Sequence, residues 1–167
     1  MNLHIGDPVM HWTYGFGYVV GLEERMISDR KSLYYAISVR DLTVWVPADD
    51  QLETRLRRPT SKSEFKNLFS ILAGTSEPLP DDRQERKAWL VEKLKDGQAE
   101  SLCRVLRDLA SFQQVHTLNY NDQNLMKRSR EALLGEWIYV LSVPAAQAES
   151  DLRRMLEGGT AVKTKEQ

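Results

Sequence analysis

The spacing of apolar residues changes once along this chain, and the change divides it into a β-rich part and a helical part. Up to Pro47, apolar side chains come in short runs rich in β-branched and aromatic residues, at residues 9–11, 18–20, 33–39 and 42–46. Such runs are typical of short β-strands. From Ser61 onward, apolar residues recur three and four positions apart, which is typical of amphipathic helices. The sequence therefore predicts the α+β class, with a β module followed by an all-helical module.

The β module is expected to close into a small barrel. Turn signals separate its runs at residues 6–8, 14–17, 28–30 and 40–41. Four or five short strands in so few residues bend strongly, and closing the sheet removes the exposed edges that an open meander would leave. Pro47 and the polar residues 49–51 end the module. We expect the barrel within residues 1–58.

A connecting helix and a linker are expected to follow the barrel, over residues 59–80. Ser61 and Glu64 have the spacing of a capping box, and Gly74 ends the helix that they begin. The linker that follows contains two prolines. Its length and composition indicate limited freedom between the modules.

The helical module is expected over residues 81–159, with a disordered tail at residues 160–167. Its first helix starts at Asp81 and Asp82, where acidic side chains favour the positive end of a helix dipole. Further helices are expected around Leu102, from the candidate N-cap Asn119, and from Pro144 to the glycine pair at residues 158–159.

Composition excludes several classes of protein. The net charge is −1, and residues 61–167 carry sixteen basic and sixteen acidic side chains, so a general nucleic-acid coat protein is excluded. No run of eighteen apolar residues is present, which predicts no membrane span. The single cysteine, Cys103, cannot form an internal disulfide, and no signal peptide is recognisable. We expect a cytoplasmic monomer.

No motif predicts catalysis, a metal or a cofactor. The glycines of residues 15–21 resemble a dinucleotide-binding loop, but the third glycine is one residue late and a β run follows where a helix must begin. A tight hairpin turn is the better interpretation. The three histidines, His4, His11 and His116, fall in three different elements and have no metal-ligand spacing. We therefore expect that this protein is not an enzyme.

Two groups of residues are candidates for binding a partner. Trp45 alternates with Val44 and Val46, so it points outward if the valines point into the barrel. There it could anchor a partner or cover a gap between the modules. Arg83, Arg86 and Lys87 could contact phosphates, or could form a solvated helix face together with neighbouring glutamates.

The residues are similar to those of the CarD/CdnL family of bacterial regulators that bind RNA polymerase, whose N-terminal module also occurs in the transcription-repair coupling factor. The matching features of the β module are Gly6-Asp7, Gly15, Gly17, Tyr34-Tyr35 and the sequence VWVP at residues 44–47. In the helical module they are KLKDG, Arg107-Asp108-Leu109, Leu118 and REALLGE at residues 130–136. The resemblance covers residues 3–142, and its strength lies in the order of the motifs.

The resemblance implies a Tudor-like barrel that binds the β subunit of RNA polymerase, and a helical domain that touches promoter DNA and stabilises the open complex without catalysis. Arg25 and Ile27 match family positions at the polymerase interface. Trp45 stands at a third such position, which is often basic in the family. An apolar contact there would weaken the salt dependence of binding.

The DNA-binding half of the family pattern is only partly kept. Arg83 stands where the family has a tryptophan that wedges into the minor groove, while Arg86 matches a basic position. Together with Lys87, Lys127, Arg128 and Arg130, these residues are the predicted DNA contacts. An arginine can enter a narrow minor groove but cannot wedge by apolar stacking. The alternative is a divergent protein–protein adaptor that does not bind DNA.

Overall fold

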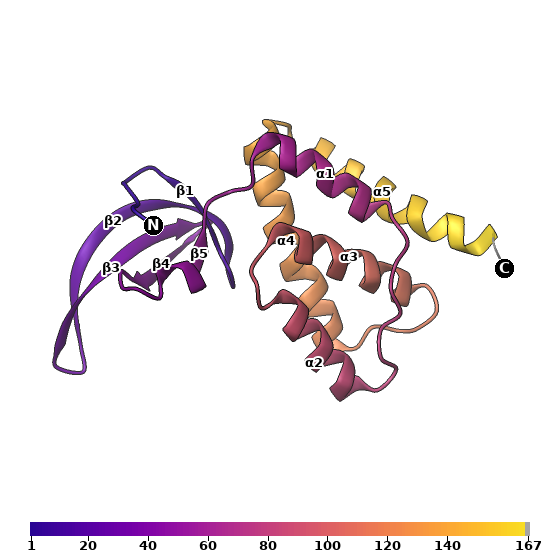
Figure 1. Ribbon diagram of the computed structural model, residues 1–167, viewed down its shortest axis with the longest axis horizontal. Coiled ribbons are helices and arrows are strands. Elements are labelled where there is room, and N and C mark those ends of the chain that lie inside the picture. Colours follow the sequence, from indigo (N-terminus) through magenta and orange to yellow (C-terminus); the bar gives the residue numbers. More distant parts are fainter. Residues whose placement is uncertain (166–167) are drawn as a thin grey trace. The chain divides into compact units, whose positions relative to one another are not determined.

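The computed structural model describes residues 1–165 of the chain (Figure 1). The chain divides into two compact units, the first comprising Met1–Pro59 and the second beginning at Thr60. The first unit is a five-stranded sheet and the second contains five helices, which confirms the α+β prediction. No helix in the described part of the chain is long and apolar enough to cross a membrane.

The first unit is an antiparallel sheet with strand order β4-β3-β2-β1-β5. Its strands are β1 (Pro8–His11), β2 (Gly15–Ile27), β3 (Arg30–Val39), β4 (Leu42–Pro47) and β5 (Leu56–Arg57), and a short 3-10 helix, η1 (Leu52–Thr54), precedes β5. Alternate side chains of β3 form the core, since Tyr35, Ile37 and Val39 are all buried. They pack with a cluster that includes Val9 and Val46.

The glycine-rich segment forms the β1–β2 hairpin, as the sequence predicted. His11 pairs with Gly15, whose φ of +90° favours glycine. The Nδ1 atom of His11 accepts hydrogen bonds from the backbone N–H groups of Thr13 and Tyr14, at 3.0 and 3.2 Å. A Cβ atom on Gly17 would overlap the carbonyl oxygen of Ser38. These glycines therefore serve the turn and the close approach of β3.

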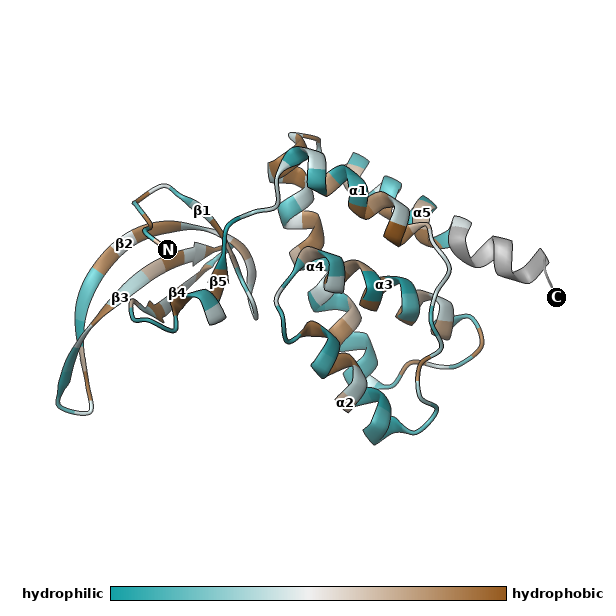
Figure 2. Cartoon of the chain, in the orientation of Figure 1, coloured by the Kyte–Doolittle hydropathy of each residue, from teal (hydrophilic) through white to brown (hydrophobic). Residues whose placement is uncertain are grey.

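The second unit consists of α1 (Lys62–Leu72), α2 (Arg83–Leu94), α3 (Ala99–Gln113), α4 (Tyr120–Leu141) and α5 (Ala145–Lys165). Figure 2 shows that helices such as α1 carry both hydrophobic and hydrophilic residues, as amphipathic helices do. The predicted N-caps are observed. The Ser61 side chain accepts from Glu64 N–H at 3.3 Å, and Asn119 forms a full capping box with Asp122.

The helix that we assigned to a connecting segment is part of the helical core. Phe65 of α1 is fully buried, and its ring lies 5.8 Å from the ring of Trp137. Before α1, the Glu136 carboxylate accepts hydrogen bonds from Thr60 N–H and Thr60 Oγ1, at 2.8 and 2.9 Å. The helical unit therefore starts at Thr60, and residues 75–80 are a loop within it.

The last helix is longer than the sequence predicted. α5 continues past Gly158 to Lys165. Its N-terminal half is anchored in the core by Ala148 and Leu152. Each of the two glycines inside the helix costs only about 1 kcal/mol, which does not force the helix to end. The predicted disordered tail is thus helical up to Lys165, and residues 166–167 lie outside the described part.

Candidate functional site

The first candidate site is the outer face of the sheet, formed by β2, β3 and β4. The guanidinium carbon of Arg25 on β2 lies 4.1 Å from the centre of the Trp45 ring on β4. This is the geometry of a cation–π contact. Val46 is buried and Val44 packs against the core, so Trp45 points to the opposite face, as the alternation predicted.

The small residues between the two strands allow this contact. Ala36 of β3 pairs with Gly21 on one side and with Trp45 on the other. Although Ala36 lies on the outer face, only 3% of its surface is exposed. The absence of a large side chain at Gly21 and Ala36 lets two long side chains meet across three strands. Arg25 and Trp45 therefore cover Gly21 and Ala36 on this face of the sheet.

Ile27 lies further out on the same hairpin. It lies two positions after Arg25, so both side chains leave β2 on the same face. Ile27 is 52% exposed at the end of β2. The turn residues Ser28 and Asp29 have φ values of 53° and 62°, as a two-residue type I′ turn requires. An exposed aliphatic group on the same face as a cation and an indole ring is a surface suited to a protein partner.

The basic residues predicted to bind DNA lie on α2 and α4. Arg83 and Lys87 are one turn apart on α2 and both are exposed. Lys127, Arg128 and Arg130 on α4 are exposed too, but they do not share a face, because Arg128 and Arg130 are about 200° apart around the helix. The cations therefore point in several directions.

Arg86 is the exception, because it is buried with only 4% of its surface exposed. Its guanidinium group donates to the Asp122 carboxylate from Nε at 3.0 and 3.2 Å and from Nη2 at 2.9 Å. Nη1 donates to the carbonyl oxygens of Pro80 and Asp81, at 3.2 and 3.0 Å. The other side packs on the Phe112 ring, 4.7 Å away. The interpretation of Arg86 as a phosphate contact is therefore wrong, since its donors are occupied inside the helical unit.

A second buried carboxylate fixes the loop before α2. Asp108 of α3 accepts from Glu77 N–H at 2.9 Å and from Arg107 Nε at 3.0 Å. Together with the bonds from Arg86 to the loop carbonyls, this pins the proline-containing segment on both sides. The sequence did not predict these roles of Asp108 and Asp122, because Glu77 and Arg86 are distant from them in the chain. Only the capping-box position of Asp122 gave a local signal.

Among the described residues no group of three or more His, Cys, Asp or Glu side chains is placed to hold a metal ion. Cys103 is fully buried, and burial raises the pKa of its thiol to about 12, with a further contribution from the nearby Glu136 carboxylate. A thiol with so high a pKa is a poor nucleophile at neutral pH.

Comparison with known proteins assigns each unit to one family. Residues 3–59 match the CarD-like/TRCF RID domain, and residues 67–153 match the C-terminal domain of CarD. The second match alone covers more than half of the chain. A curated relative, the "Putative transcription factor YdeB" of Bacillus subtilis (strain 168), is 26% identical over 149 residues, which span 87% of this chain and 97% of the relative. The resemblance found in the sequence is confirmed.

Proposed function

This chain belongs to the CarD family, and we propose that it regulates transcription by binding the β subunit of RNA polymerase through its barrel and promoter DNA through its helical unit. Family membership makes it a transcription factor that interacts with RNA polymerase. Three parts are our proposal: that the partner is the β subunit, that the protein contacts DNA, and that it affects the stability of the open complex. The protein would act in the cytoplasm, as a monomer, by binding and without catalysis or a cofactor.

The observation that carries the proposal is the Arg25–Trp45 contact on the outer face of the sheet. Arg25 and Trp45 meet there and Ile27 lies further along the same face, and the resemblance to the family implies these three positions at the polymerase interface. The indole ring holds the guanidinium group in place, so that less side-chain entropy is lost when a partner binds. Such a surface fits a partner that offers an acidic side chain beside an apolar one.

Contact with DNA rests on fewer groups than the sequence suggested. With Arg86 engaged inside the unit, the exposed cations Arg83 and Lys87 on α2 remain, together with Lys127, Arg128 and Arg130 on α4. In the described part of the chain, no carboxylate pairs with any of these five side chains. A few phosphate contacts give weak binding. We therefore expect this protein to bind promoter DNA mainly when both are bound to RNA polymerase.

A second candidate function is a protein–protein adaptor without DNA binding. The burial of Arg86 favours it, because this residue was the one basic position on α2 that matched the family pattern. The neutral charge balance of the helical half favours it too. In this case the helical unit would recruit another protein to polymerase.

The test of the polymerase contact is copurification of the full-length protein with RNA polymerase. Arg25→Glu reverses the charge on the outer face and should abolish copurification, as should deletion of the β-subunit lobe to which the barrel docks. Lys31→Glu is the matched control, because Lys31 pairs with Met26 on the same hairpin and so projects from the opposite face. Normal binding by Arg25→Glu would overturn the assignment of this surface.

A further inference from the structure

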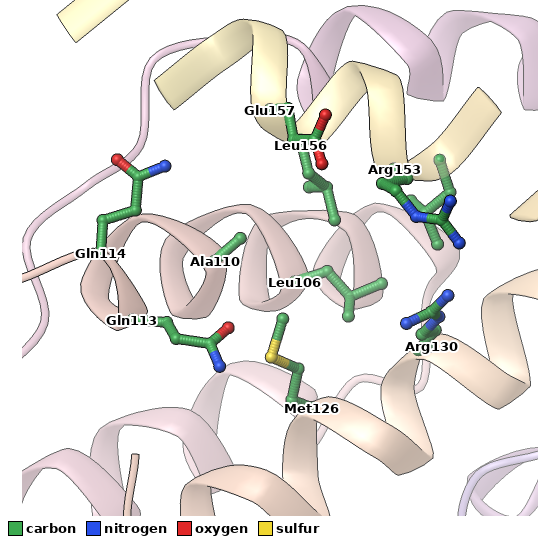
Figure 3. Close-up of a pocket in the computed structure, with 10 residues that line it drawn as sticks. Leu106, Ala110, Gln113, Gln114, Met126, Arg130, Arg153, Leu156 and Glu157 are labelled. Carbon is green, nitrogen blue, oxygen red and sulfur yellow. The ribbon is translucent and has the colours of Figure 1, made fainter. Parts of the chain in front are cut away.

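A cavity of about 360 Å³ lies between α3, α4 and α5 in the helical unit (Figure 3). Its volume falls within the range of roughly 300–1,000 Å³ of small-molecule sites. The apolar lining comes from all three helices and includes Leu106, Met126, Leu152 and Leu156. Ala110 faces the cavity from α3, where a larger residue would fill much of the space.

Two arginines from different helices lie at one end of this cavity. Arg130 of α4 and Arg153 of α5 face each other there, whereas Gln113 of α3 lies toward the other end (Figure 3). In the described part of the chain neither guanidinium group has an ion-pair or hydrogen-bond partner. Glu157 also lines the cavity, but in Figure 3 it lies away from Arg130.

Two guanidinium groups held near each other repel unless an anion lies between them. Arginine binds carboxylate and phosphate oxygens through paired hydrogen bonds. Arg130 and Arg153 are both exposed, so an anion can reach them from solvent. Next to the arginines the lining is apolar, and the amide groups of Gln113 and Gln114 lie toward the far end of the cavity. The site therefore fits a molecule that is anionic at one end and apolar along the rest.

We propose that this cavity binds a small amphipathic anion, with its carboxylate or phosphate head between Arg130 and Arg153 and its alkyl chain on Leu106, Met126 and Leu156. A volume of about 360 Å³ suits one short chain. The apolar lining offers no contact to a nucleic-acid backbone, which is polar along its whole length. Because the three helices each contribute to the site, a bound ligand ties α5 to α3 and α4. This function goes beyond the proposed regulation of transcription.

The test is the binding of three probes with one chain length and different heads to the full-length protein alone. Octanoate, 1-octanol and octylammonium are each titrated while the melting temperature and the heat of binding are measured. Octanoate should raise the melting temperature saturably and protect the amides of residues 152–157 from hydrogen exchange. Equal binding of octanol or octylammonium, or no saturable binding of octanoate, would overturn the site.

Octyl phosphate and inorganic phosphate extend the series. The first separates a phosphate head from a carboxylate head, and binding of the second as tight as octanoate would contradict the role of the alkyl chain.

Variants locate the site. Arg130→Ala combined with Arg153→Ala should weaken octanoate binding at least about tenfold, because each charge-assisted hydrogen bond is worth about 1.5–3 kcal/mol. Ala110→Leu should block the alkyl chain while leaving both arginines in place. Arg128→Ala is the matched control, since this exposed cation lies on another side of α4, and it should bind octanoate normally. Unchanged binding in Ala110→Leu would refute the proposal. Neither polymerase nor a promoter is needed, so the result is independent of the proposed function.

Discussion

Arg86 of α2 and Asp122 of α4 form a buried ion pair in which one guanidinium group donates three hydrogen bonds to one carboxylate, at 2.9, 3.0 and 3.2 Å. Asp122 is also the third residue of α4, where its side chain accepts from Asn119 N–H at 3.1 Å. The same carboxylate thus caps α4 and holds α2 against it. This pair fixes the relative placement of two helices that carry candidate DNA contacts.

Replacing Arg86 with alanine is therefore expected to destabilise the helical unit. Removing one partner of a buried pair leaves the other charge uncompensated, which costs about 3–5 kcal/mol. Urea unfolding followed by circular dichroism measures the loss. Arg83→Ala, at an exposed position one turn earlier, should change the stability by about 0.5 kcal/mol or less. Similar stabilities for the two variants would contradict the structural role of Arg86.

The contact between Arg25 and Trp45 is expected to stabilise the barrel by a small, measurable coupling energy. At an exposed site a cation–π pair is worth about 0.5–1 kcal/mol. A double-mutant cycle of Arg25→Ala and Trp45→Ala, followed by chemical denaturation, isolates this energy from the loss of packing over Ala36. The same cycle with Lys31→Ala in place of Arg25→Ala should give no coupling, because Lys31 projects from the other face. Equal coupling in both cycles would point to a general effect of the hairpin.

DNA binding in the complex with polymerase should depend only shallowly on salt. Each phosphate neutralised adds about 0.9 to the slope of log affinity against log salt concentration, so removing Arg83 and Lys87 together should lower that slope by about 1.8. Promoter binding measured over a series of potassium chloride concentrations gives the slope. Lys66→Ala on α1 is the control and should leave it unchanged. If the double variant also leaves the slope unchanged, the adaptor function is favoured.

Local patterns predicted the elements well, but they did not predict which elements pack together. The alternation of Val44, Trp45 and Val46 correctly placed the tryptophan on the outer face. The proline-containing loop at residues 75–80 suggested a domain boundary, yet the buried side chains of Asp108 and Arg86 bind that loop to the helical unit. Such pairing depends on side chains that are far apart in the sequence, as the separation of 36 positions between Arg86 and Asp122 shows.

One local feature of the sequence indicates that Arg86 is buried. Leu90 follows it by four residues on the same side of α2, and both are buried. An apolar residue at that spacing places the arginine beside the core face, where it needs a partner. A similar local feature indicates on which side of α4 the Arg130 side chain lies. Met126 precedes Arg130 by one turn and lines the same cavity. Charge alone therefore overestimates the surface available to a nucleic acid.

Cys103 is expected to make the stability of the helical unit fall with rising pH. Burial raises the pKa of its thiol from 9.0 to about 12, so the folded state keeps the proton that the unfolded state loses above pH 9. The unfolded state then binds fewer protons, and the free energy of unfolding decreases by up to about 1.4 kcal/mol per pH unit between these two pKa values. Below pH 9 both states are protonated and the thiol adds no pH dependence. Urea unfolding from pH 8 to pH 10.5 measures the stability of the native protein and of Cys103→Ala. Because lysine and tyrosine titrate in both proteins, the difference between the two stabilities removes their contribution. A difference that stays constant over this range would show that the thiol is not buried as the structure places it.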